Sequence, residues 1–132
     1  KSKYTVGNFK LKVKKSLAGK GLYTETSVPK NSCITEYIGV EVAEENQYKI
    51  NSKYLFETAK NRMINGNIPK NIARYINHSC IPNCEASGPN GKVFIFSIKN
   101  IKAGEELTYN YGKEYFNEYF KNGGCRCKKC LI

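Results

Sequence analysis

The sequence predicts a mostly β protein with short helices, built as one domain. Short runs alternate apolar and polar residues, as in Phe9–Lys14, and the run Val93–Ile98 is almost wholly apolar. Glycine, proline and asparagine separate these runs at short intervals, and no long linker divides the chain. A chain of 132 residues is long enough to bury one core. We therefore expect many short strands around a single core.

Period-two alternation predicts the first strands. In Phe9–Lys14 the apolar residues fall on one face and the lysines on the other. The glycines in Gly19–Gly21 are expected to break the chain before an extended segment at Leu22–Thr24. After a turn, Cys33–Val42 forms the next β-like run, in which Cys33 is expected to be a small core residue.

The middle of the chain alternates between short helices and loops. Helix-tolerant residues predict a short helix over Glu41–Asn51, and a helical turn is expected over Pro69–Ile76. Two prolines and a glycine predict a loop over Asn77–Pro89. Further along, Glu114–Lys121 is expected to be helical, before two glycines release the chain into its last residues.

The remaining strands are expected in two pairs. Tyr54–Phe56 and Met63–Ile64 flank a polar turn. Val93–Ile98 and Glu106–Tyr111 flank the turn Asn100–Gly104. In the last of these strands Tyr109 and Tyr111 are expected on one side.

The charge balance leaves two interpretations open. The net charge is +11, and the first 20 residues hold seven lysines and no acidic residue. Such a surface suits nucleic acid or an acidic partner. The same excess of lysine, with frequent asparagine and isoleucine, is also what an AT-rich genome would encode, and the lysines would then only solvate the surface.

No membrane or secretion signal is expected. The chain has no apolar run of membrane-spanning length. The segment Lys1–Lys15 is basic but has no apolar core and no small-residue cleavage site. We therefore expect an intracellular protein.

The cysteines predict a zinc site. Three of the six cysteines lie in the last eight residues as C-x-C-x-x-C, at Cys125, Cys127 and Cys130. A structural zinc ion usually takes four tetrahedral ligands, so one more must come from elsewhere. The candidates for the fourth ligand are Cys80, Cys84, Cys33 and the single histidine, His78.

The pair His78 and Cys80 raises a second reading, a cysteine hydrolase. We expect side chains two residues apart in extended chain to point to opposite sides, which would keep the thiol from the imidazole. On that expectation a Cys–His nucleophile is not favoured.

At this point the chain resembles a known family, the SET-domain protein-lysine methyltransferases. Arg74–Cys84, reading R-Y-I-N-H-S-C-I-P-N-C, is similar to the family's central signature, and Gly104–Gly112 is similar to its G-E-E-L-x-Y-N-Y motif. Gly19–Tyr23 and Glu36–Gly39 resemble two earlier elements. The three terminal cysteines resemble the post-SET zinc tail.

The resemblance implies an architecture and a set of roles. The fold would be a SET-domain β-fold with a C-terminal pseudoknot, with residues 1–112 as the SET domain and residues 113–132 as a post-SET helix and zinc-binding tail. Arg74–Cys84 and Glu106–Tyr111 would lie side by side, and a narrow channel lined by Tyr37 would lead the substrate lysine to the cofactor. Its catalytic residues would be Tyr111, Tyr109 and Tyr37. Its binding residues for S-adenosyl-L-methionine would be Lys20, Gly21, Leu22, Arg74, Asn77, His78 and Tyr111, with Gly19–Leu22 around the methionine end of the cofactor. Its zinc ligands would be Cys80, Cys125, Cys127 and Cys130.

The function implied is S-adenosylmethionine-dependent methylation of a protein lysine, in a histone or another basic DNA-associated protein. A tyrosine at position 109 resembles the members that stop at mono- or dimethyl-lysine. The lysine-rich surface would then face DNA or the nucleosome. The protein would act in the nucleus or on the chromosome if the substrate is histone, and otherwise in the cytoplasm. The alternative is a non-catalytic zinc module that binds nucleic acid or peptide.

Overall fold

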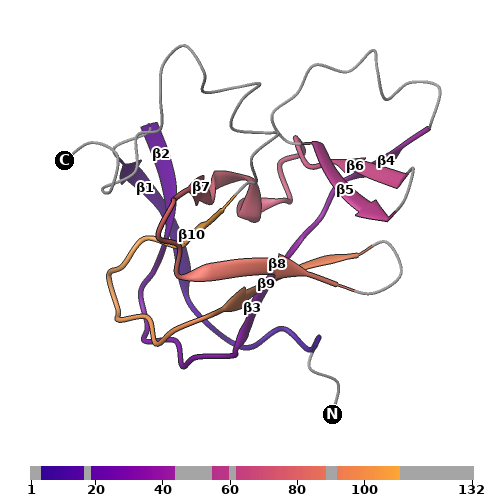
Figure 1. Cartoon of the computed structure of the whole chain (residues 1–132). Helices are drawn as coiled ribbons and strands as arrows, with labels where there is room; N and C mark the ends of the chain where they lie inside the picture. Colours follow the sequence, from indigo (N-terminus) through magenta and orange to yellow (C-terminus); the bar gives the residue numbers. More distant parts are fainter. Residues whose placement is uncertain (1–3, 17–18, 44–54, 60–61, 89–91, 111–132) are drawn as a thin grey trace.

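The structure is a computed structural model that describes residues 4–16, 19–43, 55–59, 62–88 and 92–110. Figure 1 shows its strands, which bear out the expectation of a mostly β chain. The elements within the described ranges are β1 Leu11–Ser16, β2 Gly19–Thr24, β3 Cys33–Tyr37, β4 Val40–Val42, β5 Leu55–Ala59, β6 Arg62–Asn65, the 3-10 helix η2 Ile72–Tyr75, β7 Asn77–His78, β8 Cys84–Ser87, β9 Val93–Ser97 and β10 Thr108–Tyr109.

Strands β1 and β2 form an antiparallel hairpin. Its register runs from Leu11 opposite Thr24 to Ser16 opposite Gly19. The predicted alternation is confirmed, because Leu11 and Val13 pack against the core while the lysines between them are exposed. The predicted break at Gly19–Gly21 is wrong, since this segment begins β2. Within the hairpin, the conformational freedom of glycine is needed at Gly19, where φ is 104°.

The central sheet has the order β3-β9-β8, with both pairs antiparallel. Its middle strand, β9, is the apolar run expected from the sequence, and Ile95 in it is fully buried. The loop predicted over Asn77–Pro89 is wrong in part, because β7 and β8 lie within it. The buried strand β9 needs a hydrogen-bonding neighbour on each edge, and β8 is the second of these neighbours. Its first residue, Cys84, is buried.

A second three-stranded sheet has the order β4-β6-β5 and lies on the other side of the molecule from the β1–β2 hairpin (Figure 1). The two strands expected around a polar turn are confirmed as its antiparallel pair β5 and β6. The helix predicted from Glu41 is wrong at its start, because Glu41 and Val42 belong to β4, where Val42 is buried. The rest of that prediction, and the helix predicted over Glu114–Lys121, lie outside the described residues.

The pair β7 and β10 is parallel and joins two distant parts of the chain. Asn77 lies opposite Thr108 and His78 opposite Tyr109. The N–H of Ser79 donates to the Tyr109 carbonyl at 3.1 Å, and the N–H of Leu107 donates to the Leu22 carbonyl at 2.8 Å. The two long signature segments therefore lie side by side, as expected. The pseudoknot stays a prediction, because the chain beyond residue 110 is outside the described ranges.

A single cluster of buried side chains joins the hairpin, the central sheet, β6, η2 and β10. Its largest fully buried side chains come from strands and connecting segments along most of the described chain, and they are Leu22, Ile34, Ile76, Ile95, Ile101, Leu107 and Val28. Helix η2 confirms the helical turn expected before Asn77. In the described part of the chain, no helix is long and apolar enough to cross a membrane.

Candidate functional site: the junction of the glycine segment with the two signature segments

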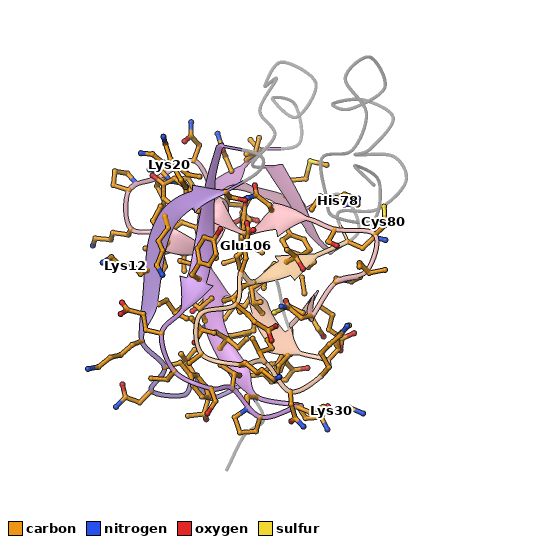
Figure 2. The ribbon with its side chains drawn as sticks, turned by 90° about the vertical axis from the view of Figure 1, so that its left-hand side faces the viewer. Lys12, Lys20, Lys30, His78, Cys80 and Glu106 are labelled. Atoms are coloured by element: carbon orange, nitrogen blue, oxygen red, sulfur yellow. The ribbon has the colours of Figure 1, made fainter. Side chains whose placement is uncertain are left out.

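A network of side-chain hydrogen bonds joins β1, β2 and β7 to the segment before β10. The Asn77 side chain donates through Nδ2 to the Lys20 carbonyl at 2.8 Å and to Glu106 Oε2 at 2.8 Å. The Ser16 hydroxyl donates to the same carboxylate, with oxygen–oxygen distances of 2.9 and 2.8 Å. In Figure 2 Glu106 lies amid the strands and Lys20 at their edge. The network thus connects three parts of the chain that are far apart in sequence.

Gly21 is a glycine because of space rather than backbone conformation. A Cβ at position 21 would collide with the Glu106 carboxylate and lie 3.0 Å from the Ser16 Cβ. At Gly19 the reverse holds, since a Cβ would meet nothing within 4 Å but φ is positive. The carboxylate of Glu106 therefore fills the room that a side chain at position 21 would need.

The predicted cofactor residues around this network have different exposures. The Leu22 side chain is fully buried, so only its backbone is available to a ligand. Lys20 is exposed, and its Nζ lies 6.0 Å from the centre of the Tyr75 ring. Arg74 is half-buried and donates from Nη2 to the Tyr75 hydroxyl at 2.9 Å and from Nη1 to Asn67 Oδ1 at 3.0 Å. The Tyr75 ring thus has two cations near it, Lys20 from β2 and the adjacent Arg74.

The Arg74 Nε is buried and, within the described residues, has no hydrogen-bond partner. An unpaired donor in such a place costs free energy unless a ligand or water meets it. This orphaned donor fits the prediction that Arg74 lies beside a bound group.

His78 and Cys80 contact one another, contrary to our expectation. The Cys80 Sγ lies 3.6 Å from His78 Nε2. The expectation was wrong in its geometry, since residues two apart in extended chain project to the same side. Burial lowers the pKa of His78 below its usual value, which disfavours the imidazolium that a thiolate–imidazolium pair requires. A Cys–His hydrolase is therefore still not favoured, now for an electrostatic reason.

The three cysteines considered as the fourth zinc ligand differ in their burial. Cys33 and Cys84 are buried, as expected for core residues, and burial raises the pKa of the Cys84 thiol to about 12. Burial also raises the pKa of Cys33, with a contribution from Glu36. Cys80 is only half-buried, which suits a ligand. No cluster of three metal-ligating side chains occurs in the described ranges, and Cys125, Cys127 and Cys130 lie outside them.

The two predicted channel tyrosines in the described part of the chain belong to the same buried cluster. Tyr37 ends β3, and its ring leaves no room for a Cβ at Gly66. Tyr109, in β10, is 8% exposed and lines an open cavity of about 370 Å³. Its other lining residues are Pro82, Cys84, Glu85, Ala86, Ile98 and Asn110. Tyr111, the predicted catalytic residue, lies outside the described residues.

Sequence reasoning missed three residues of the site. Ser16 carried no signal of its own. Glu106 stands inside the quoted G-E-E-L segment, and Asn83 inside the central signature, but neither had been assigned a role. The signal that could have found Glu106 is its place in the G-E-E-L-T-Y segment, three residues before Tyr109.

The comparisons with known proteins agree with this geometry. The SET domain family model matches residues 19–112, more than half of the chain. A relative in Chaetomium globosum, named histone-lysine N-methyltransferase, H3 lysine-4 specific, is 39% identical over 69% of this chain and 10% of its own length. A mouse relative named for H3 lysine-36 is 36% identical over 83% of this chain and 5% of its own length. A Saccharomyces cerevisiae relative named for H3 lysine-4 is 35% identical over 81% of this chain.

This chain spans only 5% to 11% of the length of these three relatives. The family match nevertheless covers the glycine segment, the central signature and the segment through Tyr109, which the structure brings together at one junction. On the sequence match and this juxtaposition, the chain belongs to the SET domain family.

Proposed function

We propose that this chain is the methyl-transferring domain of an S-adenosylmethionine-dependent protein-lysine N-methyltransferase. The observation that carries the proposal is the junction at Asn77, whose amide bonds both the glycine segment at Lys20 and the G-E-E-L segment at Glu106. Residues expected to bind the cofactor from two distant segments thereby adjoin one another. They also adjoin Tyr109, which pairs with His78.

The cofactor would be held at this junction. The backbone of Lys20 and Gly21, the side chain of Asn77 and the backbone of His78 would bind it, with Arg74 close by. When bound, S-adenosylmethionine supplies an electrophilic methyl group on a positively charged sulfur. The observation that supports the fit is Asn77 Oδ1, which accepts no hydrogen bond from the described residues and is left for a ligand.

The remaining chemistry concerns the acceptor amine. A lysine ammonium has no lone pair and must lose a proton before its nitrogen can attack a methyl carbon. Buried aromatic rings at Tyr37 and Tyr109 would desolvate the ammonium and lower its pKa. We propose that Tyr111 hydrogen-bonds at the reacting centre, and that the narrow channel mainly orients the amine for in-line displacement.

The substrate proposed is histone or another basic DNA-associated protein, and the site of action is the nucleus or chromosome. The support is the printed naming of the relatives as histone-lysine N-methyltransferases. The hydroxyl of the buried Tyr109 would hold a water that occupies the space a third methyl group requires. Mono- and dimethyl-lysine are therefore the proposed products.

A DNA contact is proposed through the outer face of β1. Lys10, Lys12 and Lys14 are exposed there, and Lys14 Nζ lies 5.2 Å from the Tyr23 ring centre. Figure 2 shows Lys12 on the same side of the molecule as Lys20. Lysines regularly spaced along one strand face can neutralise a phosphate backbone without reading its sequence. This contact would hold the enzyme beside a basic protein tail that its own charge repels.

The zinc site proposed uses Cys80 with Cys125, Cys127 and Cys130, in a post-SET tail over residues 113–132. The half-buried Cys80, next to the buried His78, supports it. Zinc would pin that tail against the central signature. Chelation should then lower methyl transfer more than it lowers the unfolding temperature of the β core.

The test of the function is transfer of radiolabelled methyl from S-adenosylmethionine to histones and nucleosomes. We expect incorporation with the wild type, and loss of most of it in Tyr111→Phe with the fold and cofactor binding largely retained. The matched control is Tyr23→Phe, a partly exposed tyrosine whose hydroxyl bonds the Lys15 carbonyl at 2.9 Å. Full activity in Tyr111→Phe would contradict the assignment. Zinc-loaded protein that fails to bind S-adenosylmethionine in calorimetry would favour the non-catalytic module.

A further inference from the structure

We propose that Glu106 is a positioning residue that sets the orientation of the Asn77 amide for binding the amino-acid end of S-adenosylmethionine. The inference rests on the proposed function. It goes beyond it in assigning work to a carboxylate that touches neither the acceptor lysine nor the transferred methyl.

The orientation of the Asn77 amide follows from its partners. A backbone carbonyl and a carboxylate only accept hydrogen bonds, so the group that faces the Lys20 carbonyl and Glu106 Oε2 must be the NH₂ group. The Ser16 hydroxyl lies further away, at 3.4 Å from Nδ2. With Nδ2 held in this way, Oδ1 is presented as an acceptor on the opposite side of the amide.

Glu106 is itself fixed from several directions. Its backbone bridges Tyr23, and its carbonyl accepts from Asn83 Nδ2 at 2.8 Å. Its carboxylate accepts from the Ser16 hydroxyl through both oxygens. Because both the backbone and the carboxylate of Glu106 are fixed, little further entropy is lost when Glu106 orders the Asn77 amide. That amide is therefore preorganised before any ligand arrives.

The chemistry identifies the ligand group. Asn77 contacts the Lys20 carbonyl, and the glycine segment there is the one expected to hold the methionine end of the cofactor. That end carries an ammonium group, which only donates hydrogen bonds. The Asn77 Oδ1 points away from the Glu106 carboxylate, which accepts a hydrogen bond from Nδ2 of the same amide. An acceptor placed in this way can bind an ammonium group. A flipped amide would instead present NH₂ to it, with no hydrogen bond formed.

The experiment compares two ligands that differ in that end. S-adenosylhomocysteine has the amino-acid end, and methylthioadenosine lacks it. We expect Glu106→Ala to weaken S-adenosylhomocysteine about tenfold in calorimetry, the usual loss for a hydrogen bond to a charged group, and to leave methylthioadenosine unchanged. Glu105→Ala is the matched control, since Glu105 is an exposed neighbour whose carboxylate, among the described residues, accepts from the Lys102 N–H at 3.2 Å alone. It should change neither affinity.

A double-mutant cycle separates positioning from a general structural role. If Glu106 acts through Asn77, then Glu106→Ala should have no further effect on S-adenosylhomocysteine affinity in an Asn77→Ala background. Additive losses, or equal weakening of both ligands, would overturn the proposal.

Glu106→Gln is the second variant, in case alanine at this position prevents folding. Its Oε1 still accepts from Asn77 and its Nε2 can donate to the Ser16 hydroxyl, so affinity should stay within about threefold of the wild type. If Glu106→Gln lost as much S-adenosylhomocysteine affinity as Asn77→Ala, the negative charge of Glu106 would be its contribution, and the positioning role would be overturned. Wild-type protein that binds methylthioadenosine and S-adenosylhomocysteine equally would overturn the inference alone, whereas binding neither would overturn the proposed function.

Discussion

Asn77 and Asn83 belong to the same signature segment and both bond the segment that leads into β10, yet the structure uses them differently. Asn83 is buried, and both ends of its amide are hydrogen-bonded. Nδ2 donates to the Glu106 carbonyl at 2.8 Å, and Oδ1 accepts from the Thr108 N–H at 2.9 Å. Asn77 is half-buried, and only its Nδ2 is occupied by the described residues.

The difference separates a residue of the fold from a residue of the site. The Asn83 amide bonds a backbone carbonyl and a backbone N–H, as a neighbouring strand would. These bonds connect the central signature to the segment before β10. An amide with one end fixed and the other open is poised for a ligand. Residue type and motif membership are the same in the two cases, so burial and partners carry the distinction.

The largest effect is expected from Asn83→Ala. It removes two hydrogen bonds and leaves the Glu106 carbonyl and the Thr108 N–H without these partners in a partly buried place, which should cost about 3 kcal/mol of unfolding free energy. Urea unfolding followed by circular dichroism measures it. Asn100→Ala is the control, because the side chain of the exposed Asn100 makes one hydrogen bond with the described residues, accepting from the Lys30 N–H at 2.8 Å. Its loss should cost less than about 1 kcal/mol. Equal losses would remove the structural role of Asn83.

Asn77→Ala should show the opposite balance. We expect S-adenosylhomocysteine affinity to fall about tenfold, because one acceptor to a charged group is lost. Unfolding free energy should fall by about 1 kcal/mol, since Lys20 and Ser16 can turn to water. Calorimetry and urea unfolding on the same samples give the two values. If Asn77→Ala unfolds as readily as Asn83→Ala, the distinction between the two asparagines fails.

The sequence predicted the strands better than it predicted the contacts between them. The alternation at Phe9–Lys14 and the apolar run at Val93–Ile98 depend on local burial, and both expectations are confirmed. The parallel pair β7–β10 was expected only through the family resemblance. Strand β8 was missed because its pairing partner, β9, decides it, while its local proline and glycine suggested a loop.

The site was predictable in its members but not in its bonds. Asn77, Lys20 and Gly21 were expected there from motif position. Ser16 joins them only because the β1–β2 register places it opposite Gly19, next to Glu106. The contact of His78 with Cys80 was misjudged from a wrong rule about extended chain, which the observed 3.6 Å separation corrects.

Substitutions at two glycines should separate ligand affinity from stability again, with smaller effects than those at the two asparagines. Gly21→Ala should push the Glu106 carboxylate away from Asn77 and weaken S-adenosylhomocysteine binding about fivefold. The loss of stability should be small, because the two closest obstructing atoms are the end of the Glu106 side chain and the third, the Ser16 Cβ, lies 3.0 Å away. Gly19→Ala should do the reverse. Its positive φ costs about 1 kcal/mol of stability, while the open space around it leaves Glu106 in place. Calorimetry and thermal unfolding of both variants check the crossing pattern, and parallel changes in both variants would contradict it.

The smallest effect should come from lysines that take part in neither asparagine network. Lys12→Gln removes one exposed charge from the outer face of β1, so duplex DNA binding should weaken about twofold near physiological salt. The slope of log affinity against log salt should also fall by about one. Lys30→Gln is the control, because Figure 2 shows Lys30 at the far end of the molecule from Lys20, and it should change the slope less. Cofactor affinity and unfolding free energy should stay at wild-type values in both variants. Equal slopes for Lys12→Gln and Lys30→Gln would mean that the charge acts as a diffuse field, and the β1 face would lose its claim as the DNA contact.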